Sequence, residues 1–220
     1  RNYLENNTES KILNLDILTI GSNLENLKNV ENNSNYKFIK DDIRNESVVD
    51  NLVKDTDVII NFAAESHVDR SIANPKPFLE TNIIGTYSIL EATRKYDKQF
   101  IHVSTDEIYG DAHGKSSFDE NSQINPSNPY AATKAAADHL VSSYHRTYGI
   151  NCITTRCTNN FGPNQFPEKL IPKTIIRSIK NLKIPLYGDG MQIRSWIYVN
   201  DHAKAIENLI SKGKPGNVYN

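Results

Sequence analysis

Three strand-like segments, each with apolar residues at consecutive positions, constrain the fold of this 220-residue chain more than any other feature. They are DVIINF (57–62), QFIHVS (99–104) and NCITTR (151–156), and helical patterns separate them along the sequence. Segments that are apolar at consecutive positions are typical of parallel strands covered by helices on both faces. The alternation of strands and helices therefore predicts an α/β fold with a mainly parallel, doubly wound sheet.

Weaker patterns extend this alternation toward both ends of the chain. KILNLD (11–16) and YKFIK (36–40) are predicted strands, residues 46–53 a short helix, and residues 1–7 the end of a helix. Long helices are expected at 77–96 and 130–148, because their apolar residues recur at helical spacing. A further helix is expected to begin within FPEKLIP (166–172).

The composition indicates a globular protein that binds neither nucleic acid nor a membrane. Hydrophobic residues make up 38% of the chain and the formal charge is −1, so there is no electrostatic basis for either partner. No apolar run reaches the roughly 18 residues of a membrane span, and no signal peptide opens the sequence, so a cytoplasmic location is expected. Cys152 and Cys157 lie at an odd separation in one predicted strand and face opposite ways. They are expected to be buried free thiols rather than a disulfide or a metal pair.

Residues 104–134 contain the side chains with the clearest chemical signal. STDEIYG places Thr105, Asp106 and Glu107 where a parallel strand ends, which is the edge at which α/β sheets bind ligands. PYAATK then opens a helix on which Tyr130 and Lys134, four residues apart, share one face. The ammonium group is expected to lower the pKa of Tyr130 from about 10 toward neutral pH. Tyr130 would then act as the base for a sugar hydroxyl, with the Thr105 hydroxyl on the same oxygen.

These residues resemble the extended short-chain dehydrogenase/reductase family, and within it the dTDP-glucose 4,6-dehydratases. The resemblance covers nearly the whole chain through NLDILTIGSNLENL, NFAAESHVDRSI, ETNIIGTYSILEATRKY, STDEIYG, PYAATKAAADHL, RCTNNFGPNQFPEKLIP, YGDG and RSWIYVNDH. The pair Asp106–Glu107 is the narrowest signal, because related sugar-nucleotide epimerases usually carry small residues there. The resemblance implies a Rossmann-like fold, NAD as cofactor, and conversion of dTDP-glucose to its 4-keto-6-deoxy product.

The same resemblance implies how the catalytic residues divide the work. Tyr130 takes the C4 hydroxyl proton while hydride passes to NAD, Thr105 holds that oxygen, and Lys134 tunes Tyr130 and binds the nicotinamide ribose. Glu107 then removes the C5 proton, Asp106 donates a proton to the departing C6 hydroxyl, and hydride returns to C6. Adjacent carboxyl groups can divide these roles only if their surroundings separate their pKa values.

The residues implied for NAD follow the ends of the predicted strands. Asp16 would accept hydrogen bonds from the adenosine ribose and select NAD over NADP, although the residue pattern alone favours an ordinary turn-forming aspartate. Asp42 and Ile43 are placed to meet adenine, with a simple Asx turn as the alternative. The implied cofactor set is Asp16, Ile17, Leu18, Thr19, Asp42, Ile43, Phe62, Ala63, Ala64, Ser66, Thr81, Tyr130, Lys134 and Asn160.

The residues implied for the nucleotide sugar fall mostly in the last third of the chain. Free N–H groups at the start of the helix near residue 166 favour an anion, and Lys169 beside them suits a diphosphate. Tyr187 is expected to stack on a base and Arg194 to pair with a phosphate. Ser195 stands where family members often have an aspartate that orients this arginine. The implied substrate set is Ser66, Thr105, Asn159, Lys169, Leu170, Pro185, Leu186, Tyr187 and Arg194, and no metal is expected.

The sequence departs from the family at its beginning, because the glycine-rich turn that holds a dinucleotide pyrophosphate is missing. We therefore expect part of a longer protein, with an NAD-binding domain over 1–157 and a partial substrate-binding region over 158–220, interleaved with it. The two long helices are expected to form a four-helix homodimer interface. The nearest alternative function is an epimerase or decarboxylase of the same family. The alternative of another class is a non-catalytic nucleotide-sugar or NAD-binding protein.

Overall fold

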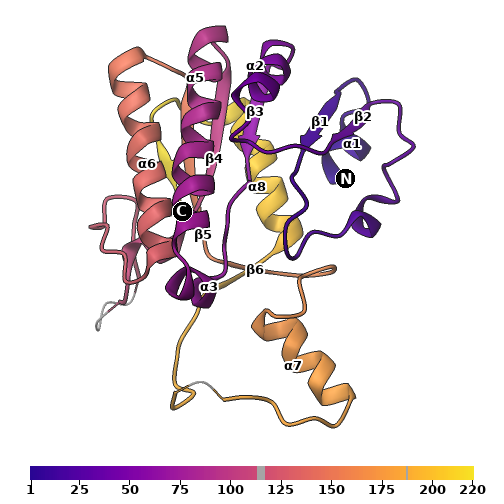
Figure 1. Cartoon of the computed structure of the whole chain (residues 1–220), viewed down its shortest axis with the longest axis vertical. Helices are drawn as coiled ribbons and strands as arrows, with labels where there is room; N and C mark the ends of the chain where they lie inside the picture. Colours follow the sequence, from indigo (N-terminus) through magenta and orange to yellow (C-terminus); the bar gives the residue numbers. More distant parts are fainter. Residues whose placement is uncertain (113–116, 187) are drawn as a thin grey trace.

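The computed structural model describes residues 1–112, 117–186 and 188–220, and it confirms the α/β fold (Figure 1). Its strands are β1 Ile12–Leu15, β2 Tyr36–Ile39, β3 Val58–Asn61, β4 Gln99–Thr105, β5 Cys152–Cys157, β6 Asn159–Phe161, β7 Trp196–Tyr198 and β8 Val218–Tyr219. Its α-helices are α1 Asn2–Asn6, α2 Glu46–Lys54, α3 Val68–Ala73, α4 Lys76–Phe78, α5 Thr86–Tyr96, α6 Pro129–Tyr148, α7 Leu170–Ile179 and α8 Val199–Lys212. Other helical segments are η1 Leu24–Leu27, η2 Leu79–Gly85 and η3 Asp106–Tyr109.

The strand pairs in the described part of the chain are all parallel, as the apolar segments predict. β3, β4, β5 and β8 form a four-stranded sheet in that order, with Phe100 opposite Cys152. β1 pairs with β2, and β6 pairs with β7, in two separate small sheets. Because β3, β4 and β5 run parallel, their carboxyl ends meet at one edge of the sheet, where the predicted catalytic residues follow β4.

A cavity of about 250 Å³ lies between the β1–β2 pair and the four-stranded sheet. Residues of β1 and β3 line its two sides, and Val49 and Val53 of α2 contribute to its wall. Within the described residues, β1 has only β2 as a hydrogen-bonded neighbour and β3 has only β4. Asp16 and Ala63, which follow β1 and β3, border the same cavity. The predicted cofactor-binding segments that follow β1 and β3 therefore border the same cavity.

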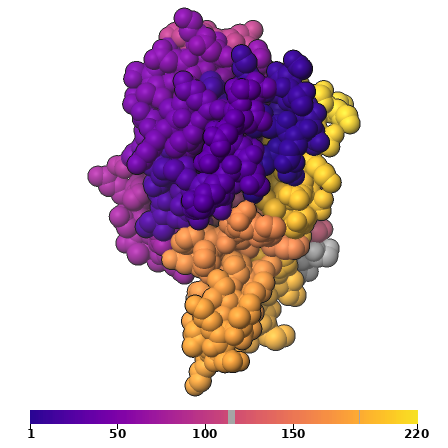
Figure 2. All heavy atoms as spheres, turned by 90° about the vertical axis from the view of Figure 1, so that its right-hand side faces the viewer, coloured from indigo at the N-terminus to yellow at the C-terminus, as the bar shows by residue number. Residues whose placement is uncertain are grey.

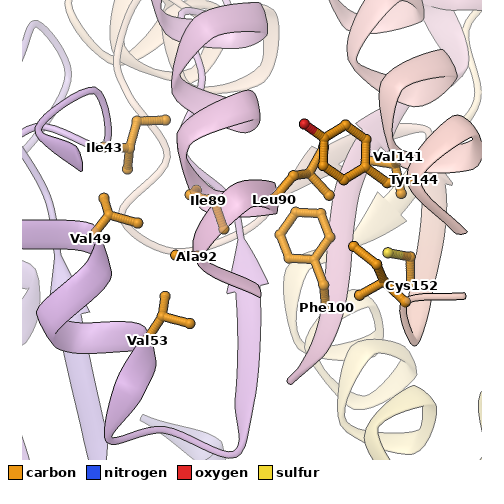
Figure 3. Packing of buried hydrophobic residues seen from close by; sticks show 11 residues of the cluster. Ile43, Val49, Val53, Ile89, Leu90, Ala92, Phe100, Val141, Tyr144 and Cys152 are labelled. Carbon is orange, nitrogen blue, oxygen red and sulfur yellow. The ribbon is translucent and has the colours of Figure 1, made fainter. Parts of the chain in front are cut away.

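The main hydrophobic core lies between the sheet and the helices α2, α5 and α6 (Figure 3). Leu90 of α5 and Phe100 of β4 are fully buried, and they lie beside Val141 and Tyr144 of α6 in Figure 3. Ile89, the neighbour of Leu90, lies between Leu90 and the α2 residues Val49 and Val53 in Figure 3. Truncating a leucine or phenylalanine in such a core costs about 3–5 kcal/mol. This packing holds α5 and α6 side by side against the sheet (Figure 1).

The helix α6 begins and ends where its sequence specifies. The Asn128 side chain accepts a hydrogen bond from the Ala131 backbone N–H at 2.9 Å, and Pro129 occupies the first turn. Gly149 ends the helix with φ +71°, a left-handed conformation that glycine adopts without strain. The cap fixes the first two turns of α6, which carry Tyr130 and Lys134.

The other long helix, expected as one element over 77–96, contains a π-helical segment between α4 and α5. Asn82 in this segment, η2, is 1% exposed. Its side-chain amide accepts from the Glu65 N–H at 2.9 Å and donates to the Glu65 carbonyl and to Thr133 Oγ1, both at 3.0 Å. A π-helical turn is frequent at functional sites. Here Asn82 ties the helix both to the segment after β3 and to α6.

The segment around α7, between β6 and β7, is less buried and protrudes from the body as a lobe (Figures 1 and 2). None of the residues of α7 is buried, and Ile175 and Ile179 on this helix are exposed. β8 returns to the main sheet and pairs with β5. The boundary at residue 157 between two functional regions remains a prediction.

The two cysteines are both free thiols. Cys152 is buried as predicted, but Cys157 at the end of β5 is only partly buried, because it lies at the strand-end edge of the sheet. In the residues that the structure describes, no helix combines the length and the apolar character needed to span a membrane.

Candidate active site

Thr105, Asp106 and Glu107 lie together where β4 ends and η3 begins, as predicted. Thr105 is 8% exposed and caps η3, because its Oγ1 accepts the Glu107 backbone N–H at 3.3 Å. The same Oγ1 lies 3.5 Å from Asp106 Oδ1. The strand end thus presents one hydroxyl and two carboxyl groups at the edge of the sheet.

Tyr130 and Lys134 approach this strand end from α6. The Tyr130 side chain interacts with that of Thr105, and its ring packs edge-on against Phe78 with 6.4 Å between centroids. Lys134 is 3% exposed, and its Nζ donates to the carbonyl of Val103 in β4 at 2.8 Å. The structure therefore brings the hydroxyl, the phenol and the buried lysine into one site.

The ionisation of Tyr130 differs from the prediction. Burial raises the pKa of Tyr130 above its ordinary value, and the charges of Glu107 and Asp106 act in the same direction, against the hydrogen bond with Thr105. The net lowering that was expected from Lys134 is wrong for this structure, because burial is the larger influence on the pKa of Tyr130. Burial lowers the pKa of Lys134 itself to about 8.

Asp106 has surroundings that favour its protonated form. Burial raises its pKa above the ordinary value, while hydrogen bonds from Thr158 and Thr105 and the charge of Arg194 act in the opposite direction. A carboxyl group with a raised pKa holds its proton closer to neutral pH, as a general acid requires. Asp106 is therefore suited to donate a proton.

The predicted substrate residues after β5 lie near the same edge but make mostly internal contacts. Asn159 Nδ2 donates to the Ser195 carbonyl at 3.4 Å, and Arg194 donates to its neighbour's carbonyl at 2.9 Å. Lys169 precedes the first residue of α7 without a side-chain hydrogen bond to the helix end, and burial lowers its pKa against the opposing charge of Glu107. Lys169 thus lies close enough to the acidic turn to interact with it. Ser66, Leu170, Pro185 and Leu186 are exposed, and Tyr187 is outside the described residues.

The two aspartates predicted to contact NAD both form local turns in this structure. Asp16 Oδ1 accepts the Leu18 N–H at 2.7 Å, while its Oδ2 has no hydrogen bond within the described residues. Asp42 accepts the Arg44 N–H at 2.8 Å and forms an ion pair with the same arginine at 2.6 Å. The Ile43 side chain belongs to the hydrophobic core and also lines the cavity that Asp16 and Ala63 border, so its contact with adenine remains a prediction.

The remaining predicted cofactor residues differ in exposure. Phe62 is 59% exposed after β3, which leaves its ring free to contact a ligand. Asn160 Oδ1 lies 2.8 Å from His202 Nδ1, a contact that orients the amide. Ile17 and Thr19 are exposed, and Leu18, Ala63, Ala64 and Thr81 are partly buried.

Comparison with known proteins assigns this arrangement to a family. The sequence model described as GDP-mannose 4,6 dehydratase matches residues 3–220. The chain belongs to this family. Curated relatives include the dTDP-glucose 4,6-dehydratases of Xanthomonas campestris pv. campestris (strain B100), 45% identical over 222 residues, and of Escherichia coli, 46% identical over 239 residues. The matches cover 96% and 99% of this chain but 63% and 66% of those proteins, so the chain spans less than two thirds of their length.

Solved members of the dehydratase group share the fold. The dTDP-glucose 4,6-dehydratase of Bacillus anthracis, crystallised with NAD, has a TM-score of 0.93 at 41% identity and covers 100% of this chain and 68% of its own. DesIV of Streptomyces venezuelae, with NAD and TYD bound, has the same TM-score and identity and covers 96% of this chain and 65% of its own. The UDP-glucuronic acid 4-epimerase of Bacillus cereus also has a TM-score of 0.93, but at 27% identity. This match covers 99% of the present chain and 71% of the epimerase. The resemblance found in the sequence is confirmed.

Sequence reasoning missed the buried polar residues that support the site of this family member. Ser71 Oγ accepts the Tyr130 backbone N–H at 3.1 Å, and Asn82 bridges two elements beside it. Asp138 on α6 accepts a hydrogen bond from Arg156 on β5 at 3.0 Å. The sequence did offer a signal for Asp138, because a residue four positions after Lys134 lies on the same helix face as this lysine.

Proposed function

We propose that this family member forms part of a sugar-nucleotide 4,6-dehydratase that converts dTDP-glucose to dTDP-4-keto-6-deoxyglucose with NAD. The observation that carries the proposal is the Asp106–Glu107 pair, which adjoins the Thr105 hydroxyl facing Tyr130. Oxidation of a sugar at C4 requires a base but no carboxyl pair. Elimination of water across C5 and C6 requires both a base and an acid. The names of relatives at 45% and 46% identity support the same reaction.

The residues at the ends of β1 and β3 fit the adenosine end of NAD. Asp16 and Ala63 border the cavity between these strands, and Asp16 Oδ2 is available within the described residues to accept ribose hydroxyls. The alanine side chain leaves room for a ligand near the backbone. The 220 residues contain no glycine-rich turn for the pyrophosphate, so they supply only part of the cofactor site.

The first half of the proposed reaction uses the residues at the end of β4 and the start of α6. When bound, NAD supplies the hydride acceptor for C4 and the hydride donor for C6. Thr105 and Tyr130, whose side chains interact in the structure, together hold the C4 hydroxyl while Tyr130 takes its proton. Because burial raises the pKa of Tyr130, phenolate formation requires a nearby positive charge. Lys134, with a pKa of about 8, is mostly protonated at neutral pH and supplies that charge.

The second half uses the two carboxyl groups that follow Thr105. Glu107 removes the C5 proton, which the 4-keto group makes acidic. Asp106 donates a proton to the C6 hydroxyl, which leaves as water. Burial of Asp106 supports this assignment, since its raised pKa keeps a proton available. Lys169, which interacts electrostatically with Glu107, is placed to stabilise the ionised base.

Replacing Glu107 by glutamine in the intact protein tests the dehydratase reaction. The first hydride transfer should proceed, so NADH absorbance should appear after dTDP-glucose is added and persist. The 4-keto-6-deoxy product should fall by about 100-fold or more, the scale of losing a general base. Tyr130→Phe should suppress the NADH signal from the start, and Glu46→Gln, an exposed change at the start of α2, should alter neither step. A wild-type product that retains its C6 hydroxyl would refute the proposal.

A sugar-nucleotide 4-epimerase is the second candidate, because one such enzyme of B. cereus has a TM-score of 0.93 to this chain. Its sequence identity is 27%, against 41% for the two dehydratase structures. An epimerase also oxidises C4 but leaves C5 and C6 intact. The same experiment separates the two functions, because a stalled NADH state in Glu107→Gln arises only when C5 must be deprotonated.

We also propose that the protein is a homodimer that associates through η2, α5 and α6. This surface exposes Ile84, Tyr87 and Tyr148, which are 53%, 40% and 52% exposed. Arg94 lies over the Tyr148 ring at 4.8 Å, so the apolar surface has a polar margin. The apolar residue Leu140 of α6 packs partly against the core, so the three exposed side chains are better probes of the interface. A cytoplasmic location is proposed as well, in keeping with two free thiols.

A further inference from the structure

We propose that Asp138 is a positioning residue for Lys134, as the buried counter-ion that keeps this lysine charged beneath the carboxyl end of β4. The catalytic meaning of this inference rests on the proposed function, in which Lys134 promotes ionisation of Tyr130. The pairing itself is a property of the folded chain and does not depend on a substrate.

The geometry of α6 places the two side chains on one face of the helix, at a separation longer than a direct ion pair. Asp138 follows Lys134 by one helical turn on the same face of α6, and the two residues are 4% and 3% exposed. Lys134 Nζ donates to the carbonyl of Val103 at 2.8 Å. Asp138 Oδ1 lies 3.6 Å from Nε2 of His102, the residue next to Val103 in β4. The Lys134 ammonium group and the Asp138 carboxyl group therefore lie beside neighbouring residues of β4 in the protein interior.

The other ionisable groups near Lys134 do not supply a negative charge. His102 on β4 is fully buried, and burial together with the Lys134 charge keeps its pKa well below the ordinary value, so it is neutral. Burial raises the pKa of the Cys157 thiol on β5, so it is protonated at neutral pH. Tyr130, one turn earlier on α6, is a neutral phenol for the same reason.

The remaining charges act on other groups. Asp106 and Glu107 of η3 raise the pKa of Tyr130, and Arg156 on β5 carries a positive charge. Burial raises the pKa of Asp138 as well, but the hydrogen bond and the charge of Arg156 and the charge of Lys134 act in the opposite direction. Among the described residues, Asp138 is thus the buried carboxyl group that acts on Lys134, and its negative charge opposes the effect of burial on the lysine. Without it, the lysine would share the interior with the guanidinium of Arg156 and lose its proton more readily.

Arg156 holds the Asp138 carboxylate in place. Its Nε donates to Asp138 Oδ2 at 3.0 Å, and its Nη1 donates to the Tyr109 hydroxyl at 2.8 Å and to the Glu120 carbonyl at 3.2 Å. Tyr109 is the last residue of η3, the segment that begins with Asp106. The same network therefore supports the lysine from α6 and the acidic turn after β4.

Titration of Lys134 by NMR tests the proposal without substrate or cofactor. The chain is labelled with carbon-13 at lysine Cε, and the Lys134 signal is identified by its loss in Lys134→Met. In the wild type this signal should titrate near pH 8. In Asp138→Asn, which keeps the shape and an oxygen for Arg156, the midpoint should fall by about one pH unit or more. Asp50→Asn, which removes a surface carboxylate bonded to Lys95 at 2.7 Å, should leave it unchanged.

An unchanged Lys134 midpoint in a folded Asp138→Asn protein would overturn the proposal. If this variant does not fold, the wild type decides through the carbon-13 signal of the Asp138 carboxyl carbon, assigned by through-bond experiments. An ionised Asp138 at pH 7 supports the counter-ion role, and a protonated one refutes it. Failure of the dehydratase assay together with a shifted Lys134 midpoint would refute the proposed function and leave the Asp138–Lys134 pairing intact.

Discussion

Replacing Asn82 by alanine should destabilise the chain by about 2–4 kcal/mol. The side chain is 1% exposed and makes three hydrogen bonds of 2.9–3.0 Å. Each such bond contributes roughly 0.5–1.5 kcal/mol net, which gives about 3 kcal/mol for the set. Thr133 keeps its hydrogen bond to the Tyr130 carbonyl at 2.8 Å, so its hydroxyl is not left without a partner. The Glu65 N–H and carbonyl do lose theirs, but Glu65 is only partly buried and water can replace some of the loss.

Urea unfolding followed by circular dichroism measures this free energy, and an unchanged m-value would show that the unfolded state is the same. Asn208→Ala is the matched control, because Asn208 is exposed on α8 and its amide bonds only within that helix, to Lys204 and Lys212. This control should change stability by about 0.5 kcal/mol or less. A loss below about 1 kcal/mol in Asn82→Ala would contradict the reasoning, since the three bonds would then contribute less than ordinary ones.

The sequence predicted the elements whose formation depends on local pattern. The buried strands β4 and β5 appear within one residue of their expected positions, since consecutive apolar residues suit a strand covered on both faces. α6 appears within one residue as well, because Asn128 and Gly149 mark its ends. The active-site residues Thr105 and Tyr130 meet because β4 and α6 carry them to one edge of the sheet. The spacing of residues and the order of strands were therefore sufficient to predict that Thr105 and Tyr130 lie in one site.

Features that depend on contacts between distant residues could not be predicted in this way. The π-helical interruption at Asn82 follows from bonds to Glu65 and Thr133, which lie 17 and 51 residues away. The hydrogen bond between Asp138 and Arg156 joins a helix to a strand. The sequence places Asp138 on the same helix face as Lys134, four residues earlier, but no such spacing points to Arg156. The pKa of Tyr130 was predicted in the wrong direction because burial, the largest influence, is set by the packed structure.

Two further predictions concern the surface of α5 and the interior of α6. Tyr87→Glu should convert the proposed dimer to monomers in light scattering, while Ile20→Glu, a change at a residue 73% exposed elsewhere, should not. A folded Tyr87→Glu protein that remains dimeric would place the interface on another surface. Lys134 should make stability depend on alkaline pH, because its pKa is about 8 in the folded chain and 10.5 ordinarily. Between these values the unfolded state binds more protons, so stability rises with pH, by about 1–2 kcal/mol over the first one and a half pH units. Lys134→Met should lack this rise in urea unfolding measured across the same window. Equal slopes in the two proteins would mean that the lysine keeps its ordinary pKa, and therefore that Asp138 or water compensates fully for its burial.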